Sequence, residues 1–129
     1  MFLMPIHDPT KPLAKCLDEN FELAVKCEEL GFDDFWVGEH YSSSVENIVM
    51  PEIFLAKVLD LTKRIRIGPA AVCLQYHHPV HVAGRLAFLD HLSHGRLNPA
   101  SRQEPSGRTW RSSERIPKTR PLAFPKRST

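Results

Sequence analysis

Apolar residues recur along the first 98 positions with two kinds of spacing, one typical of helices and one typical of strands. Steps of three and four residues predict three helices, and glycine or proline stands at their expected ends. These helices are predicted over 13–30, 51–62 and 79–92. Short apolar runs predict strands over 1–5, 32–37 and 65–72, and 96–98 resembles the start of a fourth. The order is therefore β-α-β-α-β-α-β.

This alternation predicts an α/β fold with a parallel sheet, because short connections favour parallel neighbours and right-handed crossovers. Two architectures have this order, a (β/α)8 TIM barrel and an open doubly wound sheet. The first strand is not followed by the G-x-G-x-x-G turn of dinucleotide-binding open sheets, which favours the barrel. A chain of 129 residues can form one domain with a modest core.

The pattern stops at Asn98. Residues 1–98 carry nine Lys and Arg against thirteen Asp and Glu, a net charge of −4, whereas 99–129 carry eight against two, a net charge of +6. The second segment also holds five prolines and five serines. Because such a segment cannot bury enough apolar surface to offset the entropy of ordering, we predict a body over 1–98 and a disordered basic tail over 99–129.

The composition also argues against several classes of protein. No apolar run approaches the ~18 residues of a membrane span, and no leader precedes a cleavage site, so a cytoplasmic protein is expected. Three cysteines without a C-x-x-C spacing favour reduced thiols. His77, His78 and His81 cluster near the third predicted helix. Pro79 would interrupt a ligand set there and no second cluster completes one, so we expect no metal.

Six short sequence blocks in the body are more specific than its periodicity. They are Met4-Pro5-Ile6-His7, Glu29-Leu30-Gly31-Phe32-Asp33, Trp36-Val37-Gly38-Glu39-His40-Tyr41, Ile67-Gly68-Pro69-Ala70-Ala71, His78-Pro79-Val80 and Leu89-Asp90-His91-Leu92-Ser93-His94-Gly95-Arg96-Leu97-Asn98. In this order and spacing they resemble the bacterial luciferase-like flavin-dependent monooxygenases. The resemblance covers residues 1–98 and implies a (β/α)8 barrel that binds reduced FMN and activates dioxygen. It is nearest to the branch that oxidises hydrocarbons and terpenes.

The resemblance also implies catalytic residues directly after the second predicted strand. Chemistry in a (β/α)8 barrel lies at the carboxyl ends of the strands, and His40 stands at such an end. It matches the family's active-site histidine, and an imidazole suits a group that both donates and accepts protons. Glu39 is the candidate to orient His40. Arg85 and Arg96 are expected to be solvated or paired with carboxylates at the barrel rim.

Small residues at the end of the third predicted strand are the implied flavin contacts. A flat isoalloxazine ring can lie against a strand end only where side chains are short, as at Gly68, Ala70 and Ala71. Ala70-Ala71 corresponds to a pair that is joined by a cis peptide bond in luciferase itself. We therefore expect these three residues to bind the cofactor.

Partners follow from the same resemblance. It implies a flavin reductase that supplies reduced FMN, with dioxygen and an apolar small molecule as substrates, and intact members that form dimers. Two alternatives stay open. The F420-dependent reductases share the barrel but transfer hydride, whereas a non-catalytic interaction module would use the basic tail to bind nucleic acid or an acidic surface. Neither a nucleic acid nor a membrane is the expected partner.

The tail is interpreted as the product of a shifted reading frame. Family members continue after the last block with a buried strand, and Pro99 is expected to cut that strand here. If each codon after Ala100 is displaced by one base, the code permits Ile-Ala-Ala-Gly-Ala-Val-x-Pro-Asp-Leu-Glu-Val-Phe-Gly, which resembles the family's next segment. A complete barrel takes ~250 residues. We therefore expect a truncated and inactive chain whose open strand edges favour aggregation.

Overall fold

The computed structural model describes residues 1–41 and 43–102 as strands and helices that alternate along the chain. The strands are β1 (Phe2–Leu3), β2 (Asp34–Val37), β3 (Arg66–Cys73) and β4 (Ala100–Arg102). The helices are α1 (Leu13–Glu29), α2 (Pro51–Leu61) and α3 (Pro79–Leu92), and a short 3₁₀ helix, η1 (Leu74–Tyr76), joins β3 to α3. The three helices predicted from the apolar spacing are confirmed. The η1 turn is an addition that the spacing does not indicate.

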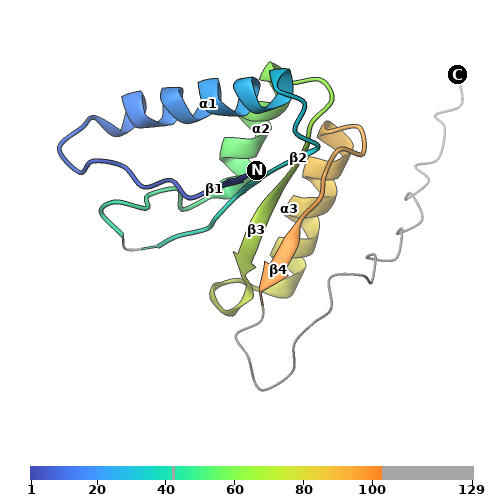
Figure 1. The fold of residues 1–129 in the computed structure, drawn as a ribbon. Helices are drawn as coiled ribbons and strands as arrows, with labels where there is room; N and C mark the ends of the chain where they lie inside the picture. The colour runs from blue at the N-terminus through green and yellow to red at the C-terminus, as the bar shows by residue number, and fades with distance from the viewer. Residues whose placement is uncertain (42, 103–129) are drawn as a thin grey trace, which may run out of the picture.

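The order of the strands selects one of the two predicted architectures. They are hydrogen-bonded in the order β1-β2-β3-β4, and each pair is parallel. An open doubly wound sheet reverses its order at a switch point, and the described strands show no reversal. The helices lie together along one side of the sheet, where α2 contacts α1, α3 and β3 (Figure 1). This is the arrangement of successive units of a (β/α)8 barrel, so the barrel prediction is confirmed.

The hydrophobic core lies between the helices and the sheet. Phe35 and Val37 of β2 and Ile67 of β3 have no exposed surface, and they share one cluster with the equally buried Leu55 of α2. Side chains alternate across a strand, so these residues all lie on the face that the helices cover. None of the described helices that form this layer is long and apolar enough to cross a membrane.

Arg96 contacts the carboxyl end of α2 and not a carboxylate at the barrel rim. Its guanidinium donates to the Leu59 carbonyl and to Thr62 Oγ1, both at 3.1 Å. The last carbonyls of a helix lack partners within the helix, and this side chain supplies the donors. The expected carboxylate partner is therefore wrong for Arg96. Arg85 does have one, since its guanidinium lies 3.5 Å from Glu52.

The fourth strand continues past Pro99, contrary to the sequence-based expectation. Leu97 pairs with Ile67, and pairing resumes beyond the proline at Ala100, opposite Ala70. The register of the β3–β4 pair is irregular here. Proline removes only its own N–H donor, so a strand can continue where that position is left out of the ladder. The start of the predicted tail thus pairs with β3, and its remainder, 103–129, lies outside the described residues.

Glu28 near the end of α1 holds the turn that leads into β3. Its carboxylate accepts the backbone N–H groups of Lys63, Arg64 and Ile65 over 2.5–3.0 Å. Burial alone would raise the pKa of this carboxyl, but the N–H donors outweigh burial and hold the pKa below its usual range. The ionised form of Glu28 is therefore favoured by folding.

We expect Glu28→Gln to lower the free energy of unfolding at neutral pH by about 1–2 kcal/mol, because N–H groups bond more strongly to a charged acceptor. The pKa of Glu28 is lower in the folded chain. Its stabilisation is therefore present above the unfolded pKa and is lost as the pH falls through the folded pKa. Urea unfolding at a series of pH values measures this loss, with Glu22→Gln on the exposed side of α1 as the control. A difference from wild type that stays constant on acidification would contradict the assignment.

Candidate functional site

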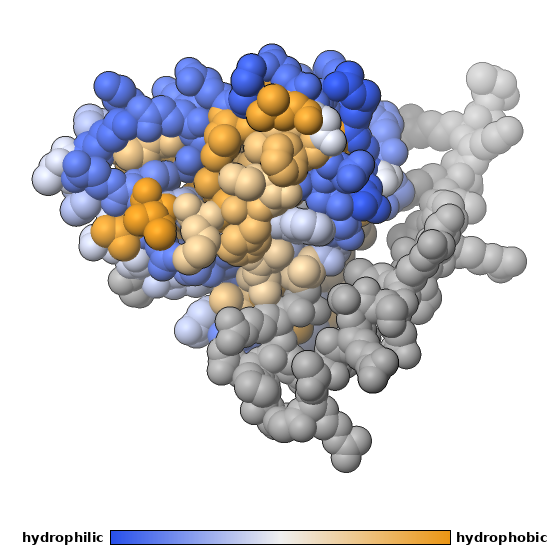
Figure 2. All heavy atoms as spheres, viewed as in Figure 1, coloured by the Kyte–Doolittle hydropathy of each residue, from blue (hydrophilic) through white to orange (hydrophobic). Residues whose placement is uncertain are grey.

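The face of the sheet opposite the helices is open and partly apolar. Around β1, Leu3 is buried, whereas Phe2 and Met4 are 46% and 53% exposed. Figure 2 shows a band of apolar surface over the strands. In a (β/α)8 barrel this face of the sheet lines the interior. It is therefore the face on which residues that contact a bound molecule would stand.

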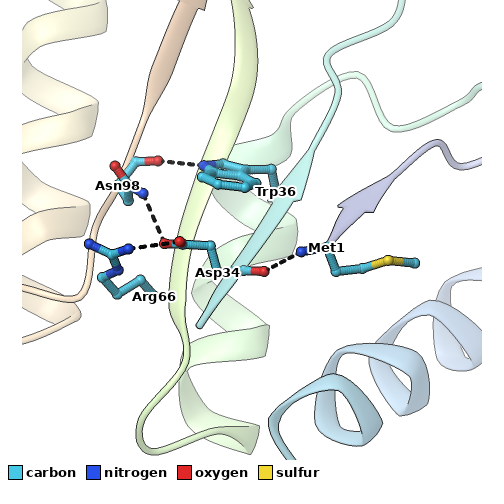
Figure 3. Close-up of polar contacts among 5 residues, drawn as sticks. All are labelled: Met1, Asp34, Trp36, Arg66 and Asn98. Carbon is cyan, nitrogen blue, oxygen red and sulfur yellow. Dashed lines mark hydrogen bonds and ion pairs between the residues drawn. The ribbon is translucent and has the colours of Figure 1, made fainter. Parts of the chain in front are cut away.

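A polar network ties the strands together near their amino ends (Figure 3). Asp34 at the start of β2 accepts from the guanidinium of Arg66 at 2.7 Å and from the side-chain amide of Asn98 at 2.9 Å. Trp36 donates its indole N–H to the Asn98 carbonyl at 2.9 Å, and the Met1 ammonium donates to the Asp34 carbonyl at 2.6 Å. These contacts join four segments of the sheet. Their position at the amino ends indicates a structural role, since barrel chemistry lies at the other end.

Gly68 lies beside this network. A Cβ built on Gly68 would be 2.0 Å from the carbonyl oxygen of Asn98. The absence of a side chain therefore lets the segment leading into β4 approach β3 closely. The structure gives Gly68 this packing role two residues before Ala70, and its contact with a flavin stays a prediction.

His40 follows β2 and turns its ring back over the open face. A Cβ at Gly38 would lie 2.6 Å from His40 Nε2 and 3.7 Å from the Phe2 ring, so the imidazole occupies space that glycine leaves. Nδ1 of the ring lies 3.6 Å from Glu46 Oε2, and both side chains are partly exposed. The backbone N–H of His40 donates to the Ile48 carbonyl at 3.1 Å. The result is a fixed, accessible imidazole with a carboxylate beside it, which suits proton exchange.

The loop that carries Glu46 is held by the segment after β1. Ile6 and Glu46 form an antiparallel bridge. His7 Nδ1 lies 2.7 Å from Asn47 Oδ1, and the side-chain amide of Asn20 lies 2.7 Å from His7 Nε2. An amide oxygen only accepts and an amide nitrogen only donates, so this geometry fits the tautomer with its proton on Nδ1. The position of the partner of His40 is thus set by residues of two other segments.

Glu39 lies next to His40 in sequence but has other partners. Its carboxylate is 2% exposed, accepts the backbone N–H of Cys73 at 2.7 Å, and pairs with His77 Nε2. The carboxylate beside His40 is that of Glu46. The expectation that Glu39 orients His40 directly is therefore wrong. The reason is the alternation along the chain, which directs consecutive side chains to opposite sides.

The peptide bond between Ala70 and Ala71 is cis, as the resemblance implies. Both alanines are partly exposed. Val37 pairs with Pro69, so the alanines lie just beyond this pair, at the same end of the sheet as His40. Their short side chains leave the backbone accessible to a flat ring, which fits a flavin. The structure thus brings His40 and the alanine pair to neighbouring strand ends.

Sequence reasoning misses two residues of this region, Glu46 and His77. Glu46 lies in an irregular loop, where no periodicity in the sequence indicates that its carboxylate lies beside the His40 ring. His77 stands in a histidine cluster that suggests metal ligation, but its ring pairs with Glu39. Across residues 1–41 and 43–102, no group of three His, Cys, Asp or Glu side chains could hold a metal ion.

The parallel strand order and the single helix layer define a protein of the (β/α)8-barrel class. A family model for luciferase-like monooxygenases matches residues 1–98. The chain belongs to the luciferase-like monooxygenase family, as the six sequence blocks predict.

Two curated relatives illustrate the match. The chain is 44% identical over 96 residues to limonene 1,2-monooxygenase of Rhodococcus erythropolis, which covers 74% of this chain and 25% of that protein. It is 39% identical over 95 residues to 2,5-diketocamphane 1,2-monooxygenase 1 of Pseudomonas putida, which covers 74% and 26%. The chain therefore spans about a quarter of the length of the curated relatives it matches.

Solved structures have the same fold. The oxygenating constituent of 3,6-diketocamphane monooxygenase from Pseudomonas putida, in complex with FMN, gives a TM-score of 0.74 at 28% identity over 78% of this chain and 28% of that chain. The monooxygenase RslO1 from Streptomyces bottropensis gives 0.74 at 34% identity over 78% and 31%. The described residues thus adopt the fold of part of these monooxygenases.

Proposed function

We propose that this chain provides part of a flavin-dependent monooxygenase site, in which one atom of dioxygen is inserted into an apolar small molecule. The observation that carries the proposal is the placement of His40 and the cis Ala70-Ala71 pair at neighbouring strand ends, beside a partly apolar face. Membership of the luciferase-like family and the FMN complex of one similar structure support it. Because the matched segment makes up about a quarter of the length of these relatives, the activity is proposed for the complete barrel.

Each residue of the site has a distinct proposed role. Ala70 and Ala71 would hold the flavin ring against the strand end, and the exposed Phe2 side chain would exclude water beside it. When bound, reduced FMN supplies the electrons that activate dioxygen. His40 would hold or pass a proton at Nε2, the atom that lies beside Gly38. The carboxylate of Glu46 beside Nδ1 would favour a proton on that nitrogen and so leave Nε2 to act as the acceptor.

We infer two partners from the same evidence. A relative from Acinetobacter baylyi, 32% identical over 81 residues, is named as the oxygenase component of a flavin-dependent trigonelline monooxygenase. That name supports a separate reductase as the source of reduced FMN. A second copy of the chain would cover apolar side chains that α2 and α3 leave exposed, namely Ile53 at 67%, Val80 at 71% and Phe88 at 66%.

Anaerobic calorimetry with reduced FMN tests the proposal on the full chain. We expect saturable binding that weakens at least about tenfold, or ~1.4 kcal/mol, in Ala71→Trp, because an indole would occupy the space of the flavin ring. His40→Ala should weaken binding by a smaller factor. The matched controls are Ala14→Trp and His91→Ala, at exposed positions of α1 and α3.

Three results would contradict the flavin proposal. One is the absence of saturable FMN binding, and another is equal weakening by Ala71→Trp and Ala14→Trp. The third is tighter binding of coenzyme F420 than of FMN under the same conditions, which would favour the hydride-transferring branch. If the chain binds no FMN but binds an oligonucleotide with an affinity that falls as salt is added, the interaction module is favoured.

A further inference from the structure

Glu39 is a buried carboxylate with hydrogen-bond partners at the end of β3, in the turn after it and at Tyr41. Its side chain is 2% exposed and that of His77 is 10% exposed, and the two form the Glu39–His77 pair. The other carboxylate oxygen accepts the backbone N–H of Cys73 at 2.7 Å, and the Cys73 thiol lies 3.7 Å from the Glu39 carbonyl oxygen. A buried charge is tolerated only when it is paired and hydrogen-bonded, and these contacts meet that condition.

These contacts join the carboxyl ends of two strands. Glu39 is the second residue after β2, and Cys73 is the last residue of β3. His77 follows η1, so the Glu39–His77 pair also fixes the turn that leaves β3. The backbone N–H groups at the end of a strand have few ladder partners, and a carboxylate is a strong acceptor for one of them. Glu39 therefore links the end of β3 and the turn after it to the segment after β2.

Tyr41 packs on the same segment from the outside. Its ring contacts Tyr76 edge-on with centroids 5.5 Å apart, and His77 at 6.1 Å. Burial and the neighbouring charge of Glu39 raise the pKa of the Tyr41 hydroxyl, so the phenol stays protonated beside the Glu39–His77 pair. The residues on either side of His40 in sequence are thus both anchored to the segment after β3. The ring of His40 instead lies over the open face, beside Gly38.

We propose that the Glu39–His77 pair is a positioning device that fixes the carboxyl end of β3, and with it Ala70 and Ala71, relative to His40. This inference rests on the proposed flavin function, because the position of Ala70 and Ala71 relative to His40 matters only if flavin binds there. Glu39 thereby acts on the site through β3 and does not contact the imidazole of His40. The pair deepens the proposed function by adding His77, which stands in none of the six sequence blocks and which the sequence suggested only as a metal ligand.

Amide hydrogen exchange on the full chain, without flavin, is the first test. We expect Glu39→Ala to speed exchange at Cys73 and Ala71 by at least about tenfold, with His77→Ala producing a smaller increase. The effect of the double variant should be smaller than the sum of the single effects, because both substitutions break one unit. Glu39→Gln keeps an acceptor for the Cys73 N–H and should restore most of the protection. Glu22→Ala and His91→Ala, at exposed positions, are the controls.

Binding of reduced FMN is the second test. Glu39→Ala and His77→Ala should each weaken the affinity for reduced FMN several-fold, whereas Glu39→Gln should bind nearly as well as wild type. A general loss of stability would not produce this difference between Glu39→Ala and Glu39→Gln. If Glu39→Ala does not fold, the double variant of Glu39→Gln and His77→Ala is compared with wild type instead. If the wild-type chain does not bind FMN, the proposed function fails while the exchange data still decide the positioning role. Exchange at Ala71 and Cys73 equal to that of the controls, or fully additive effects, would overturn the inference.

Discussion

Phe35→Ala is expected to remove a large part of the stability of the folded chain. The Phe35 side chain has no exposed surface and belongs to the core cluster with Leu55 and Ile67, between the sheet and α2. Truncating a buried phenylalanine costs about 3–5 kcal/mol, because apolar contact is lost and a cavity remains. Domains are typically stable by only ~5–15 kcal/mol, and the uncovered face of this sheet contributes little burial. The variant should therefore show a much lower urea midpoint by far-UV circular dichroism.

Phe32→Ala is the matched control for Phe35→Ala. Phe32 precedes β2 by two residues and is 46% exposed, so its truncation should change the free energy of unfolding by less than about 1 kcal/mol. Similar midpoints for the two variants would show that the layer between α2 and the sheet is not the core of the folded chain.

Gly68→Ala should also destabilise the chain, by a different mechanism. The added methyl would lie 2.0 Å from the Asn98 carbonyl oxygen and 3.0 Å from the Pro99 nitrogen, and both are backbone atoms that cannot rotate away. Overpacking of this kind costs about 1–3 kcal/mol. We expect the loss to be concentrated at β4. Exchange of the Asn98 amide, which donates to the Ile67 carbonyl at 2.7 Å, should accelerate more than exchange within β2.

Gly84→Ala provides a control with the opposite sign. Gly84 lies within α3, and a Cβ built there meets no atom within 4 Å apart from the chain neighbours and backbone of its own helix. Alanine in a helix interior is more stable than glycine by about 0.5–1 kcal/mol, so this variant should gain stability. If Gly68→Ala and Gly84→Ala shift the urea midpoint in the same direction, the close approach of the Asn98 carbonyl to β3 does not determine the stability of Gly68→Ala.

The elements of this fold could be predicted because their signals are local. Pro51 and Pro79 mark the first residues of α2 and α3, and Gly31 and Gly95 have φ angles of +82° and +81° after α1 and α3, where glycine is favoured. Periodicity supplies the rest of each helix. The barrel topology then follows from the sequential order of the strands, for which periodicity left two choices.

The details of the site could not be predicted, because they depend on contacts between segments distant in sequence. Glu46 reaches His40 only through a loop that His7 holds in place, and no spacing in the sequence encodes that path. Glu39 has partners in the last residue of β3 and in the turn after it, where the η1 geometry has no clear sequence pattern. The placement of His40 and Ala70-Ala71 at neighbouring strand ends could be predicted, because both stand in sequence blocks that resemble a family. Glu46 stands in no such block.

The hydrogen bond from the indole of Trp36 to the carbonyl of Asn98 gives this chain an intrinsic optical reporter. It links the middle of β2 to the segment that enters β4 and so passes across β3. Indole emission depends on the partner of its N–H and on access of water. Separation of β4 from the sheet would therefore change the fluorescence of Trp36 before the helices unfold, once the second indole is removed as Trp110→Phe. The attachment of the last described strand can thus be followed without any added label.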